Sequence, residues 1–197
     1  MAITDTMADS INAKSEAPAQ KLIQHFKMQK IPDEGPWFTV TYRSEDVLDA
    51  KSLPVRYQGS RVAGTAIYAV QTKEDFSALH KLVTDELWHF YGGDPLEMLL
   101  LYPDGHGEVV IIGPNALKGQ HPQFVVPRDV WQGSMPIGPA SESYSFFGNT
   151  LAPGFEFDDF KMGYCDELQQ KYPQFANHIA RLTRAEFKFQ ASSTSAV

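Results

Sequence analysis

The feature that most constrains the fold is a series of short, β-rich segments between residues 37 and 157, separated by turns rich in glycine and proline. The segments contain many β-branched and aromatic residues and recur roughly every 8–14 residues. They read WFTVTYR, GTAIYAVQ, ELWHFYGG, LEMLLLYP, GEVVIIG, QFVVP and YSFFGNTL. The intervening GGDP, PDGHGE, GPNALKG, PRD and MPIGPA are typical of turns. This pattern predicts an all-β sandwich or barrel.

Helical patterns flank the β-rich region. Residues 19–29 place three apolar side chains on one face, and residues 165–183 repeat apolar residues at spacings of three and four. Pro173 is expected to divide the second helix, because proline lacks the N–H that a helix interior needs. Short helices are therefore expected at both ends of the β-rich region.

The chain of 197 residues is long enough for one domain with a substantial core. Residues 1–18 are polar and aperiodic, which predicts a disordered N-terminal tail. Residues 185–197 are expected to form a flexible C-terminal tail on the same grounds. We therefore predict a single domain over residues 19–184.

The net charge and the cysteine content limit the classes of partner and cofactor that the protein can bind. The formal charge of −7 disfavours nucleic acid and anionic membranes, which both need a basic surface. Cys165 is the only cysteine in the sequence, which excludes an intramolecular disulfide and a cysteine-rich zinc site. No apolar run approaches the ~20 residues of a membrane span, and the N-terminus lacks a signal-peptide pattern. These features predict a cytoplasmic protein that binds a small molecule.

The candidate chemistry begins at His80 and Glu86, on either side of a predicted turn. A histidine and a carboxylate on neighbouring strands can converge in the mouth of a barrel. There they could bind a divalent metal or act as a base and the group that orients it. Gln132, which follows Trp131 and precedes a glycine, is expected at the end of another strand facing the same place.

HKLVTDE followed by LWHFYGG resembles the first motif of the cupin superfamily, which has two histidines, a glutamate and a glycine. His80 holds the first histidine position, Leu82 replaces the second, and Glu86 fits the glutamate. In the second cupin motif Asp129 replaces a glycine and Gln132 replaces a histidine.

The chain resembles one cupin subgroup in particular, the DUF985 or cupin-5 family. The matching segments are EGPWFTVTYRS, TAIYAVQ, FSALH, DELWHFYGGDPLEM, PQFVVPRDVWQG and NTLAPGFEFDDF, which follow the order of the family between residues 21 and 183. The resemblance implies a jelly-roll β-barrel (the cupin double-stranded β-helix), a homodimer, and a protein often labelled a predicted sugar epimerase.

The departures from the cupin pattern bear on the cofactor. A catalytic cupin metal normally has three histidines and one glutamate as ligands. His80, Glu86 and Gln132 are the metal ligands that this chain could offer, and only two of them are strong. His89 is expected on the opposite face of its strand from Glu86. A divalent transition metal is therefore left open rather than assigned.

A metal-free interpretation is also open. The dTDP-sugar epimerase cupins likewise lack the second histidine, and their retained histidine is the catalytic base. By this resemblance His80 would remove a proton next to a carbonyl, with Glu86 orienting it. Tyr68, Tyr91 or Tyr144 would return the proton.

Other side chains are expected to line the pocket and contact substrate: Arg43, Tyr68, Trp88, Trp131 and Gln132. An arginine fork suits a carboxylate or phosphate. Arg61 is expected to be exposed at a strand end. Glu34 and Gly35 could form a lid over the pocket, and residues 156–160 are expected at a solvated corner or a dimer edge.

Three functions follow from these residues. The first is an isomerase, epimerase or lyase that abstracts a proton from a sugar-like or carbonyl metabolite. The second is a metabolite-binding protein without catalysis, and the third is a metal-dependent oxygenase.

Overall fold

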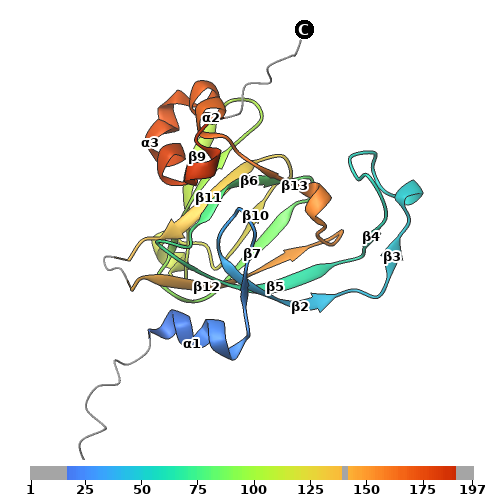
Figure 1. The fold of residues 1–197 in the computed structure, drawn as a ribbon, viewed down its shortest axis with the longest axis horizontal. Helices are drawn as coiled ribbons and strands as arrows, with labels where there is room; N and C mark the ends of the chain where they lie inside the picture. Colours follow the sequence, from blue (N-terminus) through green and yellow to red (C-terminus); the bar gives the residue numbers. More distant parts are fainter. Residues whose placement is uncertain (1–16, 139–141, 190–197) are drawn as a thin grey trace, which may run out of the picture.

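The computed structural model describes residues 17–138 and 142–189, and its centre is two antiparallel sheets that face each other (Figure 1). The larger sheet has the strand order β1-β2-β5-β12-β7-β10, with the bounds Gln29–Lys30, Trp37–Arg43, Thr65–Thr72, Tyr144–Leu151, Glu86–Gly93 and Gln123–Val126. The smaller has the order β13-β6-β11-β8-β9, with the bounds Phe160–Met162, Ser77–Leu82, Trp131–Pro136, Leu96–Leu101 and Gly107–Ile112. Strands β3 (Val47–Leu48) and β4 (Arg61–Val62) form a separate hairpin.

The predicted all-β jelly roll is confirmed, and most predicted strands are found within one or two residues. Among the described strands, those that are not in the seven segments read from the sequence are β1, β3, β4, β6, β11 and β13. Strand β6 reads SALHKL and β11 reads WQGSMP. Both strands are mostly buried although several of their residues are small or polar. Gln132 is therefore the second residue of β11, and its expected place at the end of a strand was wrong.

The hydrophobic core between the sheets lies toward one end of the barrel. It joins Ala69, Trp88 and Phe147 of the larger sheet to Met98 and Ile112 of the smaller one. The Trp88 indole stacks on the Phe147 ring, with ring centres 4.6 Å apart. Burial of these side chains closes one end of the barrel and leaves the other end to the cavity described below.

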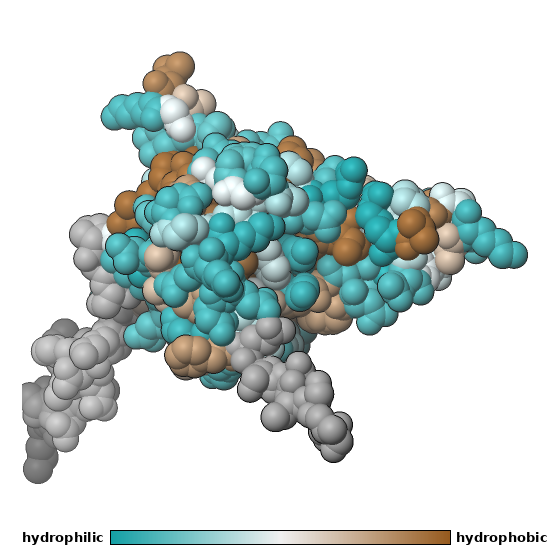
Figure 2. Space-filling view, turned by 90° about the horizontal axis from the view of Figure 1, so that it is seen from above, coloured by the Kyte–Doolittle hydropathy of each residue, from teal (hydrophilic) through white to brown (hydrophobic). Residues whose placement is uncertain are grey.

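Helices cover the outer faces of both sheets. Helix α1 (Pro18–His25) packs on the larger sheet through Ala19 and Ile23, against Val70. Helices α2 (Cys165–Lys171) and α3 (Ala176–Arg181) cover the smaller sheet, and a 3-10 turn that begins at Pro173 separates them, as predicted. Seen from the side of α2 and α3, the surface is mostly hydrophilic, with small separate apolar groups (Figure 2).

The described part of the chain has four further 3-10 turns: Ala50–Ser52, Ala116–Lys118, Phe157–Asp159 and Ala185–Phe187. The last lies inside the segment predicted to be a flexible tail. Its Phe187 ring packs 5.6 Å from the ring of Tyr164. Residues 190–197 of that segment, and residues 1–16 of the predicted N-terminal tail, lie outside the described residues.

Two positions of the cupin-like motifs adopt left-handed backbone conformations. Gly93 ends β7 with a φ of 82°, and a Cβ there would lie 2.4 Å from the carbonyl oxygen of Tyr144. Asp129, which replaces a motif glycine, has a φ of 64°. Aspartate tolerates this conformation better than most residues, so the turn before β11 is kept without the glycine.

Candidate functional site

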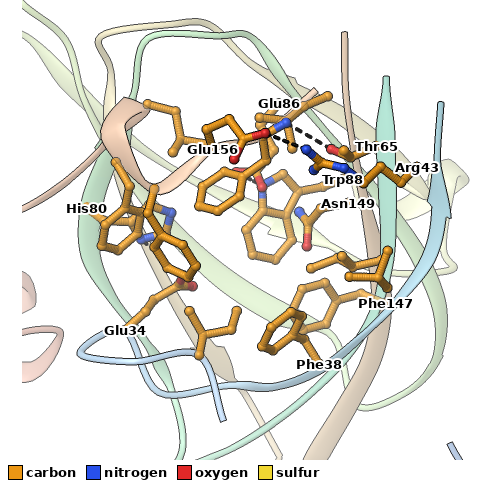
Figure 3. Close-up of a pocket in the computed structure, with 18 of the residues that line it drawn as sticks. Glu34, Phe38, Arg43, Thr65, His80, Glu86, Trp88, Phe147, Asn149 and Glu156 are labelled. Atoms are coloured by element: carbon orange, nitrogen blue, oxygen red, sulfur yellow. Dashed lines mark hydrogen bonds and ion pairs between the residues drawn. The ribbon is translucent and has the colours of Figure 1, made fainter. Parts of the chain in front are cut away.

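A cavity of about 280 Å³ opens between the two sheets, at the end of the barrel that the core leaves free. Its walls are mainly apolar and include Phe38 and Val40 of β2, Ile67 of β5, Leu82 of β6, Trp88 of β7, Phe147 of β12 and Phe160 of β13. His80, Glu86, Trp88 and Arg43 all line it, as the sequence predicted (Figure 3).

His80 is held in one tautomer by its own strand. Its Nδ1 lies 2.8 Å from the carbonyl oxygen of Ala78, which can only accept, so Nδ1 carries a proton. The pairing of β6 with β11 shifts register between His80 and Ser77, so the ladder is irregular at Ala78. The ring stacks on Phe160, with centres 5.2 Å apart. In the neutral imidazole, Nε2 is left with a free lone pair.

Glu34 lies beside His80 although it comes from the loop between β1 and β2. Its Oε1 accepts a hydrogen bond from Oγ of Ser77 at 2.6 Å and lies 3.8 Å from Nδ1 of His80. Arg184 holds the loop by donating to the carbonyl oxygens of Glu34 and Phe76, at 2.8 and 2.7 Å. Glu34 is buried and lines the cavity, so the expected lid is a fixed wall that contributes a carboxylate.

Glu86, Trp88 and Gln132 form a closed hydrogen-bond network. Gln132 Nε2 donates to Glu86 Oε2 at 2.5 Å, and Trp88 Nε1 donates to Gln132 Oε1 at 2.9 Å and to Glu86 Oε2 at 3.2 Å. Burial disfavours the charged carboxylate and raises the pKa of Glu86 to about 7, although nearby His80 opposes the shift. Glu86 can therefore serve as a proton donor near neutral pH.

Asn149 was not predicted, yet it offers the cavity an unused hydrogen-bond donor. It is 4% exposed and pairs with Trp88 across the β12–β7 ladder. Its Nδ2 has no hydrogen-bond partner among the described residues. Its amide group lies beside Trp88 and faces the cavity (Figure 3). Strand alternation in YSFFGNTL, with Phe147, Asn149 and Leu151 on one face, was the signal that could have found it.

The residues around the rim of the cavity test two predictions, one on the segment 156–160 and one on Arg61. Arg43 pairs with Glu156 at 2.5 Å, and both side chains are about half-exposed. The segment 156–160 is partly solvated, since Phe157 and Asp158 are exposed, but Phe160 lines the cavity and Asp159 is buried. Arg61 is not exposed either: it is 4% accessible and binds both carboxylate oxygens of Asp159, at 2.7 and 2.6 Å.

Tyr68 and Trp131 do not line the cavity, which corrects their predicted placement. Tyr68 lies on the outer face of β5, between Phe26 and Phe146, because its neighbours Ile67 and Ala69 point inward. Trp131 faces the helices, with Lys81 above its ring. The other two proposed proton donors, Tyr91 and Tyr144, are also absent from the residues that line the cavity. His89 lies on the outer face with Thr150, as alternation predicts.

The donor atoms do not fit the metal set of the catalytic cupins. Within the described residues, no group of three or more histidine, cysteine, aspartate or glutamate side chains is placed to hold a metal ion. Gln132, whose oxygen accepts from Trp88 and whose nitrogen donates to Glu86, is not among the residues that line the cavity, so it presents no third ligand there. His80 and Glu86 alone are a weak set for a transition metal.

A two-sheet antiparallel barrel that encloses a histidine, a glutamate and apolar walls is the architecture of a cupin. Residues 20–163 match the model of the family described as Cupin superfamily (DUF985), and the chain belongs to this family. The resemblance drawn from the sequence is thereby confirmed.

Solved structures agree with this assignment. A crystal structure of a protein from Shewanella oneidensis is 28% identical, with a TM-score of 0.74, and the match covers 84% of this chain and 97% of that one. A hypothetical protein from Leishmania major is 26% identical, with the same TM-score, and the match covers 84% and 98%. No curated protein matches the chain. None of the helices among the described residues has the length and apolar character to cross a membrane.

Proposed function

We propose that this cupin binds a small organic molecule in its cavity and catalyses a proton transfer next to a carbonyl group, as an isomerase, epimerase or lyase. The observation that carries the proposal is the fixed tautomer of His80, whose free Nε2 belongs to a cavity that also contains Glu86. A base of this kind needs an orienting hydrogen bond on its other nitrogen, and the carbonyl oxygen of Ala78 supplies it.

The proposed step begins when Nε2 of His80 takes a proton from the carbon next to the carbonyl group. The electron pair of the broken C–H bond forms the carbon–carbon double bond of an enolate, and the carbonyl oxygen takes the negative charge. Glu86 in its protonated form, and the free N–H of Asn149, are donors suited to that oxygen. Return of a proton to carbon completes an isomerisation, whereas loss of a group from the adjacent carbon completes a lyase reaction.

Glu86 replaces the tyrosines as the proposed acid. A proton donor must lie within reach of the substrate, and none of Tyr68, Tyr91 and Tyr144 lines the cavity. The raised pKa of Glu86 keeps a useful fraction of the carboxyl protonated near pH 7.

The test is exchange of substrate protons with solvent. The purified protein is incubated in D2O with a set of ketones and aldehydes, and deuterium incorporation next to the carbonyl is followed by NMR. The expected result is exchange by the wild type and its loss, by at least ~100-fold, in His80→Gln. His89→Gln is the matched control, because His89 lies on the outer face of β7. Binding without exchange would favour a cupin that binds a metabolite without catalysis.

A further inference from the structure

We infer that the cavity is built for an uncharged carbonyl compound with a largely apolar body, whose oxygen is held by Asn149, and not for a phosphorylated or nucleotide-linked sugar. The inference deepens the proposed function, because it names the class of molecule on which His80 would act. It rests on three independent features: the paired cations, the apolar walls and the unused amide donor.

The cations near the cavity are already neutralised. Arg43 is paired with Glu156 at the rim, and Arg61, which does not line the cavity, is bound by both oxygens of Asp159. No lysine in residues 17–138 or 142–189 lines the cavity. A phosphate group is usually recognised by free arginine or lysine side chains or by a helix N-terminus, and this cavity presents neither to its ligand.

Acidic groups outnumber basic ones along the walls. Glu34, Glu86 and Glu156 line the cavity, whereas Arg43 is the only arginine or lysine among the described residues that do so. An anionic ligand would have to compete with Glu156 for Arg43 and then lie near the Glu34 carboxylate in the interior. Like charges repel more strongly in a medium of low polarity than in water, so a negative ligand is disfavoured.

The larger, apolar part of the wall offers no hydrogen-bond partner to a sugar; the polar side chains along it are Gln29, Glu34, Arg43, Thr65, His80, Glu86, Asn149 and Glu156. A sugar presents many hydroxyl groups, and each needs a hydrogen-bond partner once it is removed from water. Phe38, Ile67, Leu82 and Phe147 supply none, and the rings of Phe155 and Phe157 continue the apolar lining at the rim. A volume of about 280 Å³ lies at the lower end of ligand pockets, so the ligand is compact.

Asn149 supplies the one buried donor that has no use within the described residues. A buried N–H without a partner is unfavourable, and an acceptor oxygen on the ligand would satisfy it. Asn149 pairs with Trp88, and the neighbouring inward position of β12, Leu151, pairs with Glu86. Asn149 and Glu86 are therefore diagonal neighbours on the inner face of the sheet, where both can approach one carbonyl oxygen.

The experiment measures binding by calorimetry to the full chain. The probes are three uncharged ketones of increasing size (cyclohexanone, 2-indanone and 2-tetralone), indane-2-carboxylate as the anionic counterpart, and dTDP-glucose. We expect at least one ketone to bind at least tenfold more tightly than the carboxylate and the nucleotide sugar. The leucine side chain of the Asn149→Leu variant has a similar shape but no hydrogen-bond donor. This variant should bind that ketone at least fivefold more weakly and leave the circular dichroism spectrum unchanged.

A second variant tests the charge argument. Glu156→Gln removes the partner of Arg43 and should strengthen binding of indane-2-carboxylate at least fivefold, with little change for the ketones. The inference is overturned if no ketone binds at millimolar concentration, if dTDP-glucose or the carboxylate binds the wild type more tightly, or if Asn149→Leu binds the ketone as well as the wild type does.

The same samples separate this inference from the proposed function. His80→Gln should retain ketone binding, because Nε2 is needed for proton transfer and not for holding the oxygen. Ketone binding without deuterium exchange in the wild type would overturn the proposed catalysis alone. Deuterium exchange into a sugar substrate, without binding of any ketone, would overturn the proposed class of ligand and leave the proposed catalysis intact.

Discussion

Glu86 and Gln132 are separated by 46 residues and lie in different sheets, yet a hydrogen bond of 2.5 Å joins Gln132 Nε2 to Glu86 Oε2. The bond ties β7 to β11 across the interior of the barrel. It also fixes the orientation of the Gln132 amide, whose oxygen accepts from Trp88 and which does not line the cavity.

Replacing Glu86 with Gln should change how stability depends on pH. The pKa of Glu86 is raised from 4.5 to about 7 in the folded protein. The stabilisation from the protonated form is complete below pH 4.5 and is lost as the pH rises through about 7. Two and a half pKa units correspond to about 3 kcal/mol. Urea unfolding of the wild type and of Glu86→Gln, at pH 5 and pH 8, should show the wild type losing about this much relative to the variant. A constant difference would contradict the raised pKa.

Proton exchange by the wild type should decline above pH 7. The proposed acid is the protonated form of Glu86, and its pKa of about 7 means that this form is lost on the alkaline side. A rate profile for solvent exchange between pH 5 and pH 9 should therefore fall about tenfold for each pH unit well above 7. Glu86→Gln should remove this alkaline limb. A limb unchanged in the variant would assign it to another group.

The two arginine–carboxylate pairs at the mouth of the barrel should differ in their effect on stability. Arg61→Ala leaves Asp159 buried without a partner, which should lower the free energy of unfolding by about 3 kcal/mol. Arg43→Ala breaks a pair whose side chains are 50% and 40% accessible, so its cost should stay below about 1 kcal/mol. Chemical denaturation of both variants measures the difference, and equal losses would contradict the burial of Arg61.

Arg184→Ala should loosen the loop that carries Glu34. The guanidinium group donates to the carbonyl oxygens of Glu34 and Phe76, and the Glu34 carbonyl also accepts from the Ala78 N–H. Hydrogen exchange should show faster exchange of the Ala78 amide in the variant, because its acceptor is no longer held. Lys188→Ala is a suitable control, since Lys188 bonds the Ala180 carbonyl away from this loop. Unchanged protection at Ala78 would mean that Ser77 alone fixes Glu34.

Much of the site was predictable wherever strand alternation was applied consistently. His80, Glu86 and Trp88 face the cavity, and His89 faces away from it, as a period of two requires. The same rule shows why Trp131 and Gln132 cannot both line the pocket as predicted from the sequence. They are adjacent in one strand and must point to opposite faces. Tyr68 failed for a similar reason, since Ile67 occupies the inward position beside it.

The sequence by itself determined the jelly roll, its helical flanks and the family, because these follow from local periodicity, turn residues and motif order along the chain. Only the tertiary structure decided which groups meet in the cavity. Glu34 lies beside His80 although it belongs to a loop distant in the sequence. Arg61 pairs with Asp159, 98 residues away, and the Asn149 Nδ2 has no partner among the described residues. Hydrogen bonding, burial and charge pairing between remote segments depend on three-dimensional distance, which the order of residues along the chain does not specify.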